Sequence, residues 1–130
     1  MLRKLAVLIL SALLLEAAQP ALAQKTGPNG GLLAGKDGHQ TELVVSPTEL
    51  TVYILDRGKV HDMKGMQIRA VVQSAGKMTN IDLVDVEGKK MVGKLSAPLG
   101  KGAIIVITGK DDHGHMISTR HVLNLSLIHI

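Results

Sequence analysis

The feature that most constrains this chain is a period-2 alternation of apolar and polar residues, interrupted by turn residues about every 8 to 12 positions. Leu50, Val52 and Ile54 alternate in one segment, and Ile68 and Ala70 begin the same pattern in another. Successive side chains of a β-strand point to opposite faces, so this period indicates strands with one buried face. We therefore predict an all-β fold, a single antiparallel β-sandwich of roughly seven or eight strands.

Turn residues set the expected strand boundaries. Arg57-Gly58, Ala75-Gly76 and Glu87-Gly88 lie between apolar segments, where such residues favour tight turns, and Asp111 to Gly114 is expected to be a hairpin loop. No window after Gln24 has the apolar period of an amphipathic helix. The predicted strands are a short one near Leu32-Leu33 and longer ones at His39–Val45, Glu49–Asp56, Met66–Gln73, Lys77–Val84, Met91–Leu95, Ala103–Ile107 and His115–Leu123.

Residues Met1–Ala23 have the three parts of a cleavable secretory signal peptide in the expected order. Arg3 and Lys4 give a positive start, and an apolar run of eleven residues, LAVLILSALLL, follows. That run is too short to cross a bilayer as a stable helix, and Pro20 and an Ala-Leu-Ala site precede the expected cleavage after Ala23. The alternative is an uncleaved anchor, which Glu16 disfavours by shortening the run. We expect export, with no stable membrane insertion after cleavage.

Cleavage would leave 107 of the 130 residues, enough for one small domain. Basic residues fall from 15 to 13 and acidic residues from 11 to 10, which gives a net charge of +3 spread along the chain. With one Tyr and no Phe or Trp, the chain lacks the basic stripe and stacking rings of nucleic-acid binders, so no nucleic-acid partner is expected. Because it has no cysteine, this domain must be held together by burial, or by burial and a ligand.

The chain ends in an apolar hexapeptide, LSLIHI, at Leu125–Ile130. It resembles the translation of a transposon-end sequence used as a DNA-sequencing adapter, which implies that the natural sequence stops near Asn124. The alternative is a genuine apolar C-terminal strand. We therefore expect a signal peptide at 1–23, a flexible N-terminal arm at 24–38, a sandwich domain at 39–124 and an artefactual hexapeptide at 125–130, and we exclude His129 from the candidate sites.

Histidine and methionine are the candidate metal ligands of the exported part. It contains five histidines besides His129 and five methionines. Imidazole and thioether together favour copper, and imidazole alone also suits zinc or nickel. A copper or zinc ion is therefore the expected cofactor, although the chain has no closed structural zinc pattern such as paired C-x-x-C.

One group of these ligands surrounds Gly114. His113 and His115 flank this glycine, which lets the backbone fold so that both imidazoles face one ion, and Asp111 and Met116 stand beside them. Asp112 adds a second carboxylate. The alternative interpretation is a polar hairpin tip, in which Asp, His and Gly serve only the turn.

A second group follows the pattern His61-x-Met63-x-x-Met66, which suits a loop that binds a soft metal. The alternative is a connecting segment whose methionines fill gaps in the core. His39 begins a predicted strand and His121 lies in the last one. Taken alone, each of these two is expected at a strand edge or on the surface.

Three motifs together resemble a known module: GPNGG at 27–31, HQTELVV at 39–45 and GKDDHGH at 109–115. The chain is similar to the small β-sandwich region of periplasmic adaptor (membrane fusion) subunits of heavy-metal efflux pumps and of related stand-alone exported proteins. The resemblance covers most of the exported part. It implies a periplasmic location, an envelope efflux complex as partner, and a metal role for Glu42, which matches the family pattern. Asn29 and Gln40 stand where the family often has histidine, and His39 is one residue before the second of these positions.

These observations support two hypotheses. The first is a periplasmic transition-metal-binding or metal-handling accessory domain beside a heavy-metal efflux system. The second is a non-enzymatic protein-interaction sandwich of the cell envelope with no metal site. No G-x-S-x-G or H-E-x-x-H motif is present, so no enzymatic activity is expected. The candidate metal ligands are His113, His115, Asp111, Met116, His61, Met63, His39 and Glu42.

Overall fold

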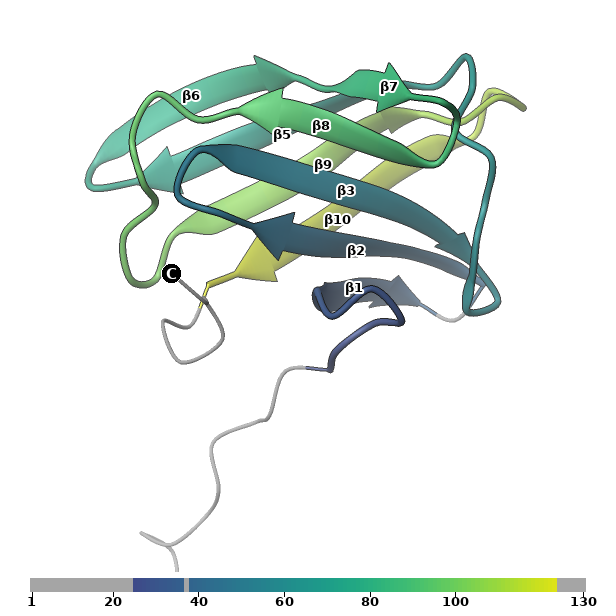
Figure 1. Ribbon diagram of the computed structural model, residues 1–130, viewed down its shortest axis with the longest axis horizontal. Helices are drawn as coiled ribbons and strands as arrows, with labels where there is room; N and C mark the ends of the chain where they lie inside the picture. Colours follow the sequence, from purple (N-terminus) through teal and green to yellow (C-terminus); the bar gives the residue numbers. More distant parts are fainter. Residues whose placement is uncertain (1–24, 37, 124–130) are drawn as a thin grey trace, which may run out of the picture.

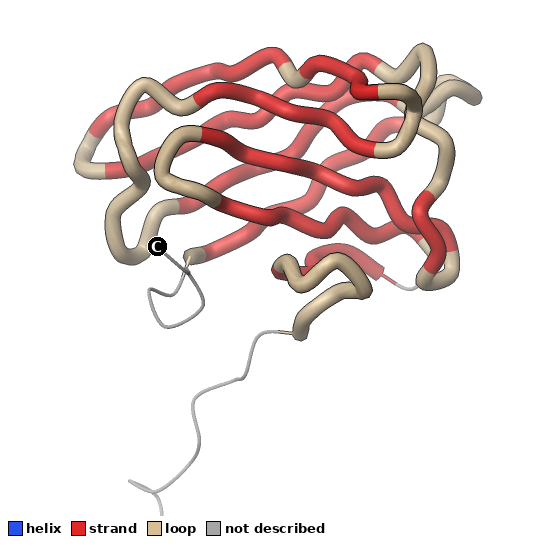
Figure 2. The backbone as a smooth tube through the Cα atoms, viewed as in Figure 1, coloured by secondary structure: helices blue, strands red, loops and turns tan. Residues whose placement is uncertain are grey.

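The structure, a computed structural model, describes residues 25–36 and 38–123. The expected signal peptide and the terminal hexapeptide lie outside these residues. The described part consists of ten strands joined by turns and loops, with no helix (Figure 2). Accordingly, no apolar helix of membrane-spanning length occurs within it.

The strands form two antiparallel sheets that face each other (Figure 1). The first sheet has the order β1-β2-β3-β8-β7, with β4 paired to β3, and the second has the order β10-β9-β5-β6. This arrangement confirms the predicted all-β sandwich. The first sheet contains β1 (Leu32–Lys36), β2 (His39–Val45), β3 (Glu49–Asp56), β4 (Lys59–Val60), β7 (Val84–Val86) and β8 (Lys90–Lys94). The second contains β5 (Gln67–Ser74), β6 (Lys77–Asp82), β9 (Ile104–Lys110) and β10 (Met116–Val122).

Two short strands, β4 and β7, raise the count to ten from the predicted seven or eight. The predicted strand Lys77–Val84 divides at Leu83: its first part remains in the second sheet as β6, and Val84 begins β7, which pairs with β8 in the first sheet. The Leu83 side chain is buried, and its N–H donates to the carbonyl of Ile68 (3.0 Å). Because the apolar pattern continues through Leu83, the alternation alone gives no sign that the chain changes sheets.

Three predicted turns have two central residues with positive φ: Arg57-Gly58, Ala75-Gly76 and Glu87-Gly88. This conformation matches the twist of paired strands and favours glycine at the second position. In the segment expected to be an arm, β1 pairs with β2 from Leu32 opposite Leu43 to Lys36 opposite His39. The short strand predicted near Leu32 is therefore confirmed, and it forms one edge of the first sheet.

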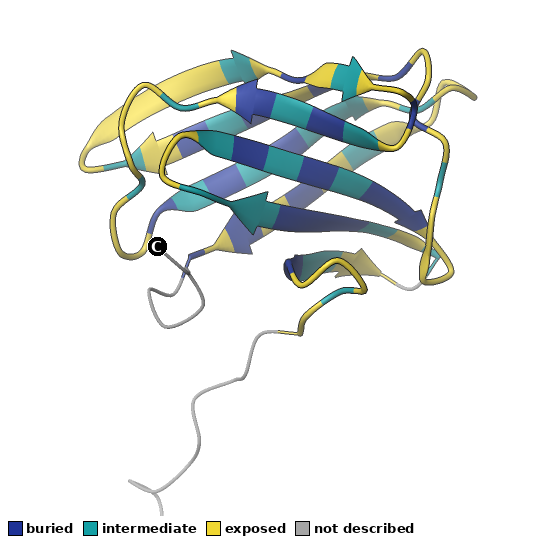
Figure 3. Cartoon of the chain, in the orientation of Figure 1, coloured by how far each residue is buried: buried dark blue, intermediate teal, exposed yellow. Residues whose placement is uncertain are grey.

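Aliphatic side chains from both sheets fill the space between them. Figure 3 shows buried positions alternating with more exposed ones along the central strands. The predicted inward residues Leu50, Val52 and Ile54 of β3 are at most 8% exposed, and so are Ile68 and Ala70 of β5. Burying each such side chain stabilises the fold by roughly 1.5–3 kcal/mol, somewhat less for alanine. The core therefore needs neither an aromatic ring nor a disulfide to form.

The interior is not entirely apolar. Thr41 of β2 and Thr119 and His121 of β10 are also buried, and they lie where the first sheet faces the last strand of the second. These polar side chains mark the end of the sandwich at which the candidate site is found.

Candidate metal centre

One carboxylate organises the loop between β9 and β10. Oδ1 of Asp111 accepts hydrogen bonds from the backbone N–H groups of His113 (2.9 Å) and His115 (2.7 Å). The N–H of Asp111 donates to the carbonyl of His115 (2.9 Å), and Gly114 has a φ of 80°, which favours glycine. The predicted hairpin loop is therefore confirmed, and Asp111 fixes its backbone.

The environment of Asp111 acts on its pKa in two directions. Burial raises the pKa, whereas the hydrogen bonds from the N–H groups of His115 and His113, and the charges of these two histidines, lower it. The net effect is a pKa below the ordinary value of 3.8. Asp111 is therefore ionised at neutral pH, with Oδ2 3.3 Å from Nδ1 of His115.

His61 reaches the same loop from the other sheet. It follows β4, and its N–H donates to the carbonyl of Ile54 (2.8 Å). Its Nε2 lies 3.3 Å from Oδ1 of Asp112, which is 51 residues further along the chain. Oδ2 of Asp112 lies 3.8 Å from Nε2 of His113. One carboxylate thus lies between two imidazoles from different loops, one after β4 and one between β9 and β10.

His61, Asp112 and His113 form a three-residue cluster whose potential ligand atoms all lie within 4.8 Å of one another. A tetrahedral ion with bonds of about 2.0–2.1 Å separates its ligand atoms by about 3.3 Å, so these atoms would have to approach by at most about 1.5 Å. Their side chains are 33%, 35% and 69% exposed, respectively. The approach therefore requires only rotation of surface side chains, with no change in the core.

The other loop candidates flank this cluster. The ring of His113 is 6.4 Å from that of His61 and 6.2 Å from that of His115, measured between centroids. Met116 is exposed at the start of β10 and lines the same cavity as these three histidines. The structure therefore brings His115 and Met116 near the cluster without placing them in it.

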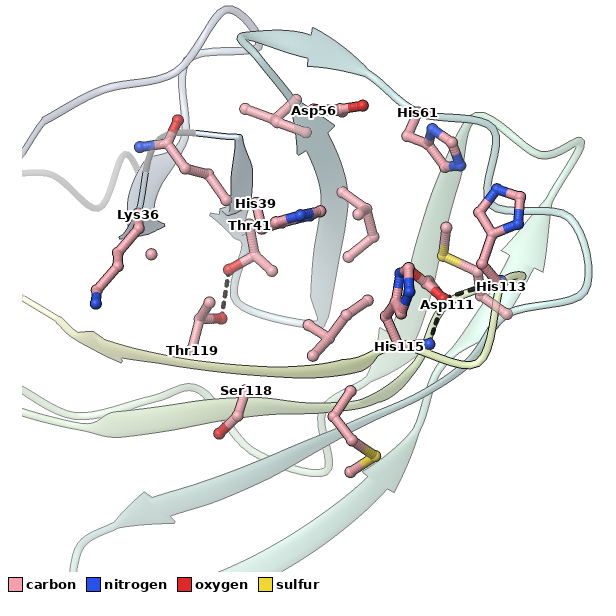
Figure 4. A pocket seen from close by; sticks show the side chains of 17 residues that line it. Lys36, His39, Thr41, Asp56, His61, Asp111, His113, His115, Ser118 and Thr119 are labelled. Carbon is pink, nitrogen blue, oxygen red and sulfur yellow. Dashed lines mark hydrogen bonds and ion pairs between the residues drawn. The ribbon is translucent and has the colours of Figure 1, made fainter.

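A cavity of about 640 Å³ extends from the three histidines into the end of the sandwich, between β1–β3 on one side and β10 on the other. Apolar side chains of Ile54, Met66 and Ile117 contribute to its walls. In Figure 4, His61, His113 and His115 lie on one side of the cavity, Lys36 lies on the opposite side, and the ring of His39 points into the space between them.

A buried polar network adjoins this cavity. Oγ1 of Thr41 lies 2.6 Å from Oγ1 of Thr119 and 2.8 Å from Nε2 of His121, so the hydrogen bonds join the two sheets. His121 lies on β10, an edge strand of the second sheet as one of the two alternatives expected, but its side chain is 3% exposed and therefore faces the interior and not the surface. Burial lowers its pKa from 6.5 to about 4, and His121 is neutral at pH 7. The alternation Ile117, Thr119, His121 already placed these three side chains on one face of the strand.

Glu42 does not lie with the histidines. It is adjacent to Thr41, which faces the cavity, and neighbouring side chains in a strand point to opposite faces. Glu42 is fully buried beneath the segment 27–31, and its carboxylate accepts hydrogen bonds from the N–H and the Nδ2 of Asn29 (2.9 and 3.1 Å) and from the N–H of Gly31 (2.8 Å). A Cβ at Gly27 would collide with this carboxylate. The structure therefore gives Glu42 a structural role.

The two methionines that follow His61 have different positions. Met63 is fully buried in the hydrophobic core, which agrees with its interpretation as filler, and it does not line the cavity. Met66 is also largely buried but lines the cavity. Of the two methionines in the predicted soft-metal pattern, Met66 therefore faces the cavity and Met63 does not. A difference of three residues in an irregular segment gives no indication of which thioether faces the core.

Among the eight predicted ligands, the structure gathers His61, Asp111, His113, His115, Met116 and His39 around one cavity, and separates Glu42 and Met63 from it. Asp112, which sequence reasoning mentioned only as an additional oxygen donor, belongs to the three-residue cluster. Comparisons with protein-family models, curated proteins and solved structures give no match for this chain.

Proposed function

We propose that this chain is an exported, periplasmic accessory domain that binds or passes on a transition-metal ion. The observation that supports this proposal best is the cluster of His61, Asp112 and His113, whose ligand atoms converge from two loops to within 4.8 Å. Histidines side by side on a surface need no such meeting of distant segments. Here the β4 end and the β9–β10 loop supply complementary donors at one point.

The donor set favours particular metals. Two imidazoles and one carboxylate suit Zn(II) or Cu(II), and three protein ligands leave further coordination positions open. The fully buried Met63 provides no thioether to this cluster, whereas Met66 and Met116 line the adjoining cavity. We therefore expect Zn(II) or Cu(II) to bind at the cluster before Cu(I).

The proposed setting rests on the sequence. The first 23 residues have the pattern of a signal peptide, and the chain resembles a region of the adaptor subunits of heavy-metal efflux pumps. An open, exposed metal site fits an accessory protein that must release its ion, because exposed ligands hold a metal less rigidly than a closed structural site. The proposed partner is therefore an envelope efflux complex, and no enzymatic activity is proposed.

A metal titration tests this function. The exported chain, purified without an affinity tag, is titrated with Zn(II) and Cu(II) while its thermal midpoint is followed. A ligand that binds only the folded state at a hundredfold excess over Kd stabilises it by about 2.7 kcal/mol, which raises the midpoint by several degrees. The double variant His61→Ala/His113→Ala should lose this increase.

The variant Asp82→Ala provides the control. Asp82 is an exposed carboxylate outside the three-residue cluster and its cavity, so its removal should leave the metal-induced increase intact. The proposal is wrong if neither ion raises the midpoint, or if the increase persists in the double variant.

A second function, a protein-interaction sandwich without a metal, is favoured by a different surface. Val84 and Val86 of β7 are 65% and 37% exposed, and β7 is an edge strand of the first sheet. Exposed apolar edge strands can pair with a strand of a partner. If this edge binds an efflux subunit, Val84→Glu should abolish co-purification with that subunit and leave the thermal midpoint unchanged. Unaltered co-purification would exclude the edge as the binding surface.

A further inference from the structure

The cavity beside the cluster is far larger than one ion requires. Its volume is about 640 Å³, within the range of roughly 300–1,000 Å³ that small-molecule sites occupy. Ile54, Met66 and Ile117 provide apolar walls, and Thr41 and Thr119 are held in place by the buried network with His121. The space is therefore bounded by side chains fixed by the fold, apart from the exposed groups at its mouth.

The metal cluster opens into this space. His61 and His113 both line the cavity, and together with Asp112 they provide three protein ligands. A tetrahedral ion with three protein ligands takes its fourth from outside, either water or a ligand molecule. An ion bound by these residues would therefore have an open position available to a molecule in the cavity that His61 and His113 line.

Charge at the opposite side of the cavity indicates what that molecule is. Lys36 of β1 lines the cavity there, and its ammonium group has no ion-pair partner within residues 25–36 and 38–123. His39, its register partner on β2, adds an imidazole that points into the cavity (Figure 4). The carboxylates of Asp56 and Asp111 also line this space, so Lys36 and His39 are the groups on this side that can attract an anion.

We infer that the cavity binds a small organic carboxylate that completes the coordination of the metal. One carboxylate of this molecule bonds to the ion at the cluster, its carbon skeleton lies against the apolar walls, and a second carboxylate is attracted by Lys36. The inference rests on the proposed metal site. It states that the domain handles a chelated ion, as a ternary complex of protein, metal and carboxylate.

Citrate is a suitable probe because it has several carboxylates and fits the class of ligand. The chain is placed in equilibrium dialysis with equimolar Zn(II) and citrate, and both are measured on the protein side. We expect retention of one Zn(II) and one citrate per chain. In separate experiments, Zn(II) is titrated without citrate, and citrate is titrated into the Zn(II)-loaded protein.

The variant Lys36→Gln removes the charge but not the metal ligands. It should weaken citrate binding to the loaded protein about tenfold and leave Zn(II) affinity without citrate unchanged, whereas Lys36→Arg should largely restore citrate binding. Lys77→Gln is the matched control, since Lys77 is an exposed lysine of β6 that does not line the cavity. It should change citrate binding less than twofold.

The two proposals fail in distinguishable ways. If Zn(II) binds alone but citrate only removes it, or if Lys36→Gln has no more effect than Lys77→Gln, the ternary complex is wrong and the metal site stands. If neither Zn(II) nor Cu(II) binds, the proposed function is wrong, and the ternary complex that depends on it is wrong too.

Discussion

Two sets of polar side chains in this sandwich differ in how they are satisfied. Glu42 and the Thr41–Thr119–His121 network are buried, and their hydrogen bonds are 2.6–3.1 Å long. The cluster of His61, Asp112 and His113 is at least one-third exposed, and its contacts are 3.3–3.8 Å long. Buried polar groups need partners within the protein, whereas loosely paired exposed groups can exchange those partners for a ligand. We conclude that the first set maintains the fold and that the second is available for binding.

The largest effect that would test this comparison is expected at Glu42. Glu42→Ala removes the acceptor of three hydrogen bonds and leaves the buried N–H of Gly31 without its partner. Hydrogen bonds to a charged group contribute about 1.5–3 kcal/mol each, and losing a buried network costs more than one of them. We expect a decrease of about 3–4 kcal/mol in the free energy of unfolding, measured by urea denaturation.

Glu49→Ala is the control for this change. Glu49 is a partly exposed glutamate at the start of β3 whose side chain has no hydrogen-bond partner among the described residues. Its replacement should change stability by less than about 0.5 kcal/mol. Equal effects at the two positions would show that Glu42 does not hold the segment 27–31 in place. Zn(II) binding should be unaffected in both variants, because Glu42 does not line the cavity.

The next largest effect concerns pH and His121. Its pKa is about 4 in the folded protein and 6.5 ordinarily, so between these values the unfolded chain binds a proton that the folded protein does not. Stability is therefore unaffected by this group above pH 6.5 and falls as the pH drops towards 4, by about 3 kcal/mol in total. Urea denaturation at several pH values between 7.5 and 4 measures this decrease.

His121→Gln isolates this contribution. The variant keeps a polar group near Thr41 but cannot be protonated, so the slope between pH 6.5 and 4 should become smaller than in the unaltered chain. Asp111 does not interfere, because its lowered pKa supports stability above 3.8 and loses that effect only at lower pH. An unchanged slope in His121→Gln would mean that another group titrates in this window and that the interior network is not the pH-sensitive element.

The sequence predicted most of the fold but only part of the site. Alternation and X-Gly turns were enough for the sandwich, since period-2 patterning and positive φ depend on neighbouring residues. The change of sheet at Leu83 left no trace in the pattern. The loop at Asp111 was predictable for the same local reason. The contact between Asp112 of this loop and His61 was not predictable, because it joins residues 51 apart in the sequence.

The directions in which side chains face explain why two candidate ligands, Glu42 and Met63, lie away from the cavity. Thr41 and Leu43 are inward residues of β2, so Glu42 between them had to face outward, and the glycines of the 27–31 segment indicated that a backbone covers it closely. That reasoning would have separated Glu42 from the other candidate metal ligands. Nothing in the sequence indicates that Met63 faces the core and not the cavity. Met63 lies between two strands, where the alternation of inward and outward side chains does not apply.

The smallest change in stability is expected at Asp112, where the change in binding is the informative one. Asp112→Asn keeps the shape of the side chain and removes a charge that is paired only with partly exposed imidazoles. Such surface pairs contribute about 0–1 kcal/mol, so the free energy of unfolding should change by less than about 0.5 kcal/mol. The loss of a ligand from the cluster should weaken Zn(II) binding at least about tenfold.

Asp82→Asn is the matched control, because Asp82 is an exposed carboxylate paired with Arg69 at 2.9 Å and lies outside both the cluster and its cavity. It should alter neither quantity appreciably. If Asp112→Asn instead destabilised the protein as much as Glu42→Ala, the Asp112 carboxylate would maintain the fold. The comparison between buried structural groups and exposed groups available for binding would then not hold for this loop.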